Sequence, residues 1–320
     1  MTRWAREAER AGLGSLWFVE DYFEPGAFSL AAAAAAVTES PAIGLGVVNP
    51  FTRHPALLAM ETAALSGVAS GRVLLGLGSS NRVWIEEQMG IPFTTPLQAL
   101  RECVEIIRRL WSGERLSYQG RCFTLRDVAL DFKPAQPELP ILLGAKAPKA
   151  LTLAGEVADG VHCSILASPE HVRRVCAITA EARRSAGRAG DFAVIAYLPM
   201  AVAQDGERAR AHMKPLLARY LGLLHGQSIL KDAGLSDART LPFKEALLRG
   251  ESPTHLVSDD LLETFAVAGT PDECRRALSR WAEAGLDAPV AVPAPGLDPV
   301  EQLQFLGSEL APFWREMVCR

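Results

Sequence analysis

The sequence predicts an α/β protein built on a (β/α)8, or TIM, barrel of parallel strands. Short, continuously apolar runs alternate with longer amphipathic segments along the chain. Strands without polar alternation are typical of a parallel sheet that helices cover on both faces. Polar and glycine-rich phrases follow several of these runs at their carboxyl ends, which is where barrel enzymes carry their active sites.

Seven apolar runs are predicted to be strands, namely residues 15–19, 43–48, 73–78, 140–144, 160–165, 192–198 and 288–292. The segments between them predict helices over 1–13, 28–38, 54–68, 95–111, 148–156, 169–186, from 207 onward, 270–284 and 299–318. Thr270 is expected to cap its helix, and Pro55 suits a first helical turn. A small hairpin is expected to turn at 118–121.

The strand count fits two architectures. A doubly wound open sheet tolerates seven strands. An eight-stranded barrel also fits if its first strand is missing from this chain, since the chain begins with a helix where a barrel begins with a strand. We expect the barrel. No linker divides residues 1–320, so a single domain is expected, with an irregular insertion at about 222–260.

Composition argues against several classes of function. The chain is 49% hydrophobic and 22% charged, with a net charge of −4, so nucleic acid is not an expected partner. No apolar run is long enough to predict a membrane span, and no apolar segment follows the basic start as in a signal peptide. The six cysteines form neither a C-x-x-C pair nor a zinc pattern. We therefore expect no metal, and reduced thiols in a cytoplasmic protein.

Polar or small residues lie at the carboxyl ends of five of the predicted strands or directly after them. They are Glu20, Asp21 and Tyr22, then Asn49, Thr52, Arg53 and His54, then Ser79 and Ser80, then Ala145, Lys146 and Lys149, and finally His162 and Ser164. Because the strands of a parallel barrel all end at one rim, we expect these residues around a single cavity. The small residues at these strand exits could admit a flat ring or a phosphate.

Glu20, Asp21 and His54 are the candidates for proton transfer. Neighbours on an extended segment point in different directions, so only one of the two carboxylates should face the cavity; a solvated pair is the equal alternative. His54 lies beside a helix start, where the pKa of its ring should fall. A capping histidine is the stronger interpretation, and His162 is more typical of a packed side chain.

Two glycine phrases could admit an anion. Gly76-x-Gly78 is at most half of a dinucleotide fingerprint, because a third glycine is lacking and no helix follows at once, so a tight strand exit is favoured. At 144–149 a glycine ends a strand and a helix begins near Pro148. The free N–H groups of a helix start attract anions, and Lys146 adds positive charge. An ordinary turn with solvated lysines is the alternative.

Four phrases resemble one known family. They are residues 46–55 (GVVNPFTRHP), 70–78 (SGRVLLGLG), 144–149 with 154–160 (GAKAPK and AGEVADG) and, more weakly, 269–273 (GTPDE). Together they are similar to the luciferase-like monooxygenase superfamily. Within it they resemble the deazaflavin-dependent methylenetetrahydromethanopterin reductases. The likeness covers about residues 1–200 and 265–295.

The resemblance implies a bacterial luciferase-like barrel, often homodimeric, with coenzyme F420 favoured over FMN as cofactor. It also implies a non-proline cis peptide at Gly46–Val47, in a bulge behind the cofactor ring. Asn49 and Thr52 would line the pocket. The cofactor phosphate would lie near residues of two loops, Gly78, Ser79 and Ser80 in the first and Gly144, Ala145, Lys146, Ala147 and Pro148 in the second.

The implied activity is hydride transfer between reduced coenzyme F420 and a small organic substrate, with the protein supplying orientation and a dry pocket. An FMN-dependent monooxygenase that uses molecular oxygen is one alternative, and a non-catalytic flavin-binding barrel is another. Glu20 and Asp21 stand where relatives usually carry an aspartate and a histidine, and the region 222–260 matches nothing in the family. These departures leave the proton donor and the substrate open.

Overall fold

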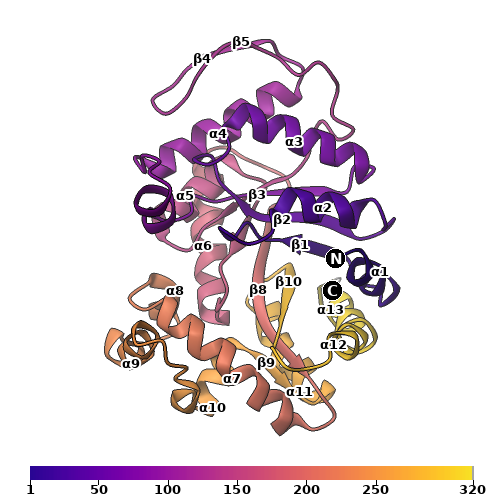
Figure 1. Cartoon of the computed structure of the whole chain (residues 1–320), viewed down its shortest axis with the longest axis vertical. Coiled ribbons are helices and arrows are strands. Elements are labelled where there is room, and N and C mark those ends of the chain that lie inside the picture. Colours follow the sequence, from indigo (N-terminus) through magenta and orange to yellow (C-terminus); the bar gives the residue numbers. More distant parts are fainter. Residues whose placement is uncertain (319–320) are drawn as a thin grey trace.

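A curled parallel sheet forms the centre of the computed structural model, which describes residues 1–318 (Figure 1). The strands are β1 (Ser15–Phe18), β2 (Ala42–Val48), β3 (Val73–Leu77), β6 (Ile141–Gly144), β7 (Gly160–Cys163), β8 (Ala193–Val202), β9 (Val267–Gly269) and β10 (Ala288–Pro293). Seven of them pair in the order β1-β2-β3-β6-β7-β8-β10, and β9 pairs with the carboxyl end of β8.

The strand order follows the chain without reversal, and every ladder of this sheet is parallel. A doubly wound sheet would reverse its order at a switch point. That alternative is therefore wrong, and the sheet is of the barrel type. Within the described chain no ladder joins β1 to β10, so the ring is open there. All seven predicted strands are confirmed, whereas β9 is too short for its periodicity to be recognised.

Helices flank the sheet much as predicted. They are α1 (Thr2–Arg10), α2 (Ala27–Ala35), α3 (Pro55–Val68), α4 (Pro96–Trp111), α5 (Pro148–Val157), α6 (Pro169–Ser185), α7 (Gly206–Leu223), α11 (Pro271–Glu283), α12 (Pro299–Phe305) and α13 (Ala311–Val318). Thr270 and Glu273 form the expected capping box. A π-helical turn, Leu306–Leu310, divides the expected last helix. The first helix, α1, and the last, α13, lie on one side of the molecule (Figure 1).

The segment 222–260 is not irregular, which corrects the expectation from sequence. It contains α8 (Ser228–Asp232), α9 (Asp237–Leu248) and the start of α10 (Asp259–Phe265). Gly226 and Gly234 take positive φ angles of 80° and 77° on either side of α8. Glycine adopts such angles easily and so ends helices. These breaks keep each helix too short to show a clear hydrophobic period.

Buried apolar side chains from both halves of the chain form one contiguous core, which extends from Ala5 to Trp314. The five cysteines in the described part are free; Cys103, Cys163 and Cys274 are buried, and Cys319 lies outside the described residues. No helix among residues 1–318 is both long and apolar enough to cross a bilayer.

The predicted hairpin is confirmed as β4 (Leu116–Gln119) and β5 (Thr124–Val128), which extend from the top of the molecule in Figure 1. Glu102 of α4 is 2% exposed and fastens the hairpin turn. Its carboxylate accepts the backbone N–H groups of Arg121, Cys122 and Phe123 at 2.8 to 3.0 Å. Burial alone would raise the pKa of Glu102, but the hydrogen bonds outweigh burial and hold this pKa below its usual value.

We expect Glu102→Gln to lower the free energy of unfolding by about 2 kcal/mol at neutral pH, because hydrogen bonds to a charged acceptor are the stronger ones. A depressed pKa in the folded state means that this stabilisation is present above the usual glutamate pKa and is lost as pH falls. The difference between wild type and variant should therefore shrink toward pH 4. Urea unfolding at both pH values measures it, with the exposed Glu245→Gln as control. A difference independent of pH would contradict the assignment.

Candidate active site

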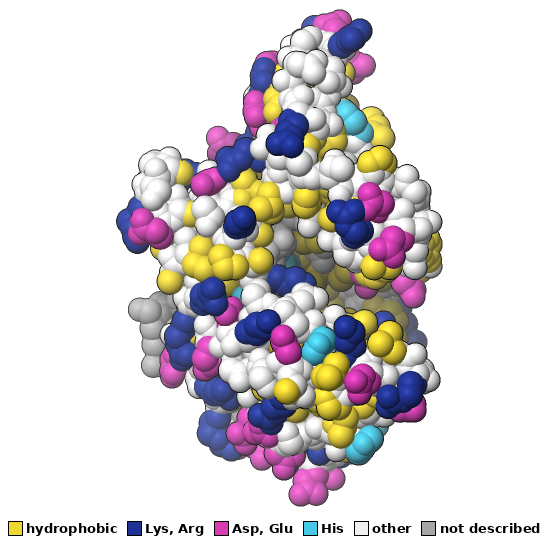
Figure 2. Space-filling view, turned by 90° about the vertical axis from the view of Figure 1, so that its left-hand side faces the viewer, with side chains coloured by type: hydrophobic (Ala, Val, Ile, Leu, Met, Phe, Trp, Pro, Cys, Tyr) yellow, Lys and Arg dark blue, Asp and Glu magenta, His cyan; other side chains and the backbone are white. Residues whose placement is uncertain are grey.

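The loops after β1, β2, β3, β6 and β7 leave the same edge of the sheet, because all five strands are parallel neighbours. The surface is hollowed on the side of the molecule where α5 and α8 lie (Figures 1 and 2). Figure 2 shows the hollow between an upper and a lower half, with apolar side chains gathered above it and basic side chains at its edge. The rim predicted from sequence therefore faces a concave surface.

Asn49 joins the loops after β1 and β2. Its side chain is buried, and its amide nitrogen donates to the hydroxyl of Tyr22 and, at 3.1 Å, to that of Thr52. Its amide oxygen accepts the backbone N–H groups of Phe51 and Thr52 at 2.9 and 3.0 Å. Asn49 and Thr52 were predicted to line the site, and here they fix the shape of one wall. Tyr22 was noted in the sequence only as a neighbour of the carboxylates.

Glu20 and Asp21 face different neighbours, as their adjacency predicts. Glu20 forms an ion pair with Arg53 at 3.0 Å, and Arg53 reaches Glu61 of α3 at 3.0 Å with its other nitrogen. The guanidinium also lies over the ring of Phe28, 5.0 Å from its centroid. The Glu20 carboxylate is therefore committed to an ion pair with Arg53. This arrangement favours a structural role for Glu20.

Asp21 lies among groups from two other elements. Tyr197 of β8 and Tyr220 of α7 are close enough for the Asp21 charge to raise their pKa values further, beyond the larger effect of burial. Desolvation raises the pKa of Asp21 itself, and the positive charge of Arg219 opposes that rise. Sequence reasoning missed these three residues, because no local motif marks a tyrosine inside a strand or a pair on an amphipathic helix.

The glycine phrases form a slot for one side chain. The Gly46–Val47 peptide is cis, as the resemblance implied, and the β2–β3 ladder shifts register between Leu45 and Val48. A Cβ on Gly76, Gly78 or Gly144 would lie 3.2, 2.4 or 3.0 Å from a methyl carbon of Val47. Gly76-x-Gly78 is therefore neither a nucleotide fingerprint nor merely a strand exit. Its glycines leave room for the displaced Val47.

A cluster of three ring side chains fills the interior beside the Val47 bulge. The ring of His162 lies 5.1 Å from that of Trp17 and 4.1 Å from that of Tyr197. The hydroxyl of Tyr197 donates to the carbonyl oxygen of Gly46. Burial lowers the pKa of His162 to about 4, and its Nδ1 lies 2.9 Å from the carbonyl oxygen of Cys163. The ring is therefore neutral and packed, which supports the interpretation of His162 as a core residue.

Two loops offer unpaired polar groups to a ligand. The hydroxyl of Ser80, in the loop after β3, is buried without a hydrogen-bond partner. In the loop after β6, Ala147 caps α5 without a side-chain hydrogen bond, and Pro148 begins the helix. Burial lowers the pKa of Lys146, and no carboxylate of the described chain forms an ion pair with it. A desolvated cation and an unpaired hydroxyl are groups that an anionic ligand would satisfy.

His54 caps α3, which is the structural alternative weighed from sequence. Its Nδ1 accepts the backbone N–H of Ala56 at 3.2 Å, and its ring packs on Phe123 of the hairpin, 5.6 Å between centroids. Partial burial lowers the pKa of His54, so the neutral ring that can accept this bond is favoured. A ring held in this way is poorly placed to transfer a proton to a ligand.

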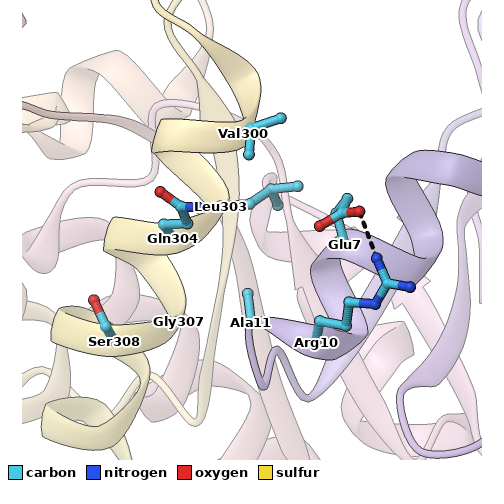
Figure 3. Close-up of a pocket in the computed structure, with 8 residues that line it drawn as sticks. All are labelled: Glu7, Arg10, Ala11, Val300, Leu303, Gln304, Gly307 and Ser308. Atoms are coloured by element: carbon cyan, nitrogen blue, oxygen red, sulfur yellow. Dashed lines mark hydrogen bonds and ion pairs between the residues drawn. The ribbon is translucent and has the colours of Figure 1, made fainter.

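A second concave feature lies away from the rim, between α1 and the C-terminal helices (Figure 3). It has a volume of about 320 Å³. Glu7 and Arg10 of α1 pair with each other at 2.7 Å on one side, and apart from Gln304 the rest of the lining is small or apolar. In the part of the chain that the structure describes, no cluster of three or more His, Cys, Asp or Glu could hold a metal ion. The rim of the sheet therefore remains the candidate site.

The fold and the rim together define a class of protein. The family model described as luciferase-like monooxygenase matches residues 1–288, and the chain belongs to this family. More particularly, the chain is 32% identical over 313 residues to the 5,10-methylenetetrahydromethanopterin reductase of Archaeoglobus fulgidus. That match covers 95% of this chain and 92% of the relative.

Solved structures agree with this placement. The coenzyme F420-dependent tetrahydromethanopterin reductase of Methanopyrus kandleri matches with a TM-score of 0.89 at 26% identity, over 98% of this chain and 95% of that one. A type II Baeyer-Villiger monooxygenase of Pseudomonas putida, solved with FMN, matches with a TM-score of 0.75 at 21% identity, over 98% and 92%. At that lower identity the likeness shows the fold alone.

Proposed function

We propose that this protein is an oxidoreductase that binds coenzyme F420 at the rim of the sheet and transfers a hydride between it and a small organic substrate. The observation that carries the proposal is the Val47 slot, in which Gly76 of β3, Gly78 directly after it and Gly144 of β6 leave room for the bulge of β2. A flat backbone surface of this kind gives a planar ring a wall without projecting side chains. The whole-length similarity to F420-dependent reductases supports the same assignment.

The residues present fit such a cofactor. Lys146, the hydroxyl of Ser80 and the start of α5 would hold its phosphate, because each offers an unpaired donor. Asn49 and Thr52 would fix the wall beside the ring. When bound, the cofactor supplies the hydride chemistry. The protein supplies orientation, exclusion of water and, through Asp21, a group able to move a proton at its carboxylate oxygen.

Titration of the full chain with coenzyme F420 and, separately, with FMN tests the proposal. We expect coenzyme F420 to quench the protein's tryptophan fluorescence and to bind more tightly than FMN. Lys146→Gln should weaken coenzyme F420 by about tenfold, since a charge-assisted contact to phosphate is lost. Lys149→Gln, on the exposed side of the same turn, is the matched control. Binding of neither cofactor by wild type would defeat the proposal, and tighter binding of FMN would favour the monooxygenase.

We also propose a homodimer formed through α2 and α3, which pack side by side. Leu57, Met60 and Val68 of α3 are 50%, 42% and 50% exposed. Glu61 is the one charged residue in either helix. An apolar patch of this extent marks an interaction surface, and a two-fold contact would cover it on both copies.

One core across the chain supports a single domain, and five free cysteines support a cytoplasmic location.

Leu57→Arg is expected to convert the dimer into monomers, because two copies of the charge would meet near the two-fold axis without partners. Sedimentation velocity at micromolar concentration measures the change. Leu248→Arg, at a 77% exposed site on α9, is the control and should sediment as wild type does. A monomeric wild type, or a Leu57→Arg variant that stays dimeric, would exclude this face as the interface.

A further inference from the structure

We propose that α8 is a clasp that positions Lys146, with Ser228 and Asp232 as its positioning residues. The inference rests on the proposed function in one respect, that Lys146 binds the anionic part of the cofactor. The contacts that carry the inference lie at the two ends of a five-residue helix.

The N-terminus of α8 contacts the loop that carries Lys146. The hydroxyl of Ser228 donates to the carbonyl oxygen of Lys146 at 3.0 Å, across 82 residues of sequence. The loop is otherwise held by the N–H of Ala145, which donates to the carbonyl oxygen of His162 at 3.2 Å. Ala147 and Pro148 follow, and the proline has no N–H to donate. The Ser228 hydroxyl is thus a main tertiary restraint on Lys146.

The C-terminus of α8 is bound to α6. Asp232, whose side chain is 6% exposed, lies 2.7 Å from the Nδ1 of His171 and also pairs with Arg174. The His171 side chain is fully buried, and its Nε2 has no partner. Burial lowers the pKa of His171 despite the carboxylate, so the neutral ring donates to Asp232 from Nδ1. Between the two ends, Ile229 and Leu230 are buried in the core.

A helix of five residues has no stability of its own, so these anchors hold it in place. Burying an imidazole against a carboxylate adds little net stability, and we assign this pair the role of fixing the position of α8. Arg174 pairs with Asp232, whereas Lys146 pairs with no carboxylate in the described residues. The local charge therefore stays positive, with one cation left for an anion. The clasp fixes the backbone from which that cation extends.

Ser228→Ala and Asp232→Asn test the clasp by two independent measurements on the full chain. The first is amide hydrogen exchange of residues 145–151 in the ligand-free protein, which we expect to speed up about three- to tenfold in each variant. Ser279→Ala and Asp272→Asn remove the same groups from α11, where the serine hydroxyl donates to the carbonyl oxygen of Arg276 and the aspartate pairs with Arg275. These controls should leave exchange in the loop unchanged, and circular dichroism confirms folding of all four variants.

The second measurement compares coenzyme F420 with its deazaflavin core that lacks the phosphate. We expect each clasp variant to weaken the phosphate-bearing form about three- to tenfold and to leave the core unaffected. Equal losses for both ligands, or unchanged exchange in the loop, would overturn the proposal. If wild type binds neither ligand, the proposed function fails, while the exchange data still decide whether α8 positions Lys146.

Discussion

Gly78→Ala is expected to abolish binding of the cofactor and to lower the free energy of unfolding by about 3 kcal/mol. The new Cβ would lie 2.4 Å from the Cγ2 of Val47, far inside van der Waals contact. Overpacking in a close-packed interior forces side chains and backbone to move. Here the movable part is the Val47 bulge, which we propose as a wall of the cofactor site. Denaturant unfolding and cofactor titration measure the two effects.

A double variant separates this cause from a general loss of stability. Val47→Ala removes the methyl groups that collide, so Gly78→Ala with Val47→Ala should recover much of the stability lost in the single variant. Gly76→Ala should not be rescued in this way, because its Cβ would lie 2.3 Å from the backbone oxygen of Leu45. Gly14→Ala, with nothing near its Cβ, is the neutral control. Equal rescue of both glycine variants by Val47→Ala would refute the slot.

Asp21→Asn is expected to lower kcat by about 100-fold while binding of the cofactor changes little. The amide keeps the shape of the carboxyl group but cannot supply the proton that we assign to Asp21. Glu20→Gln should act differently, since it breaks the ion pair with Arg53 and thereby loosens the loop. Its effect should appear in stability. Steady-state kinetics with coenzyme F420 across a substrate panel distinguishes the two, with Glu245→Gln, exposed on α9, as control.

The pH profile provides the second criterion for Asp21. Desolvation raises the pKa of Asp21 above its usual value, with Arg219 limiting the rise. A group that donates a proton must be protonated, so activity should fall as pH rises through this raised pKa. Asp21→Asn should lose that limb of the profile, whereas Arg219→Gln should move it to higher pH. An unchanged limb in Asp21→Asn would assign the proton to another residue.

Local patterns were sufficient for the elements and for the rim. Each apolar run became a strand because a strand buried on both faces must be apolar throughout. Capping residues such as Thr270 also act within a few positions of chain, so their roles could be predicted. The segment 222–260 was misjudged, because its helices are short and are stabilised by packing and by anchors such as Asp232, which no local period records.

The glycines of the site were likewise predictable in position but not in role. The sequence places Gly76, Gly78 and Gly144 at strand ends, but it cannot say what their missing side chains make room for. That became evident when the sheet brought Val47 between them. Because Glu20 and Asp21 are adjacent, their side chains were likewise predicted to point in different directions. Arg53 lies 33 positions after Glu20, and Arg219 lies 198 positions after Asp21, so no local pattern could show these partners.

The sequence by itself determined the α/β class, the positions of the strands along the chain and the strand ends at which polar residues gather, because hydrophobic period and turn chemistry act over a few neighbouring residues. Only the tertiary structure decided which of the two carboxylates pairs with Arg53, what the glycines accommodate and how the backbone of Lys146 is held. Those outcomes depend on contacts between residues distant in sequence, such as Ser228 with Lys146. Burial and pairing set the behaviour of such groups, and both arise only when the sheet curls and brings them together.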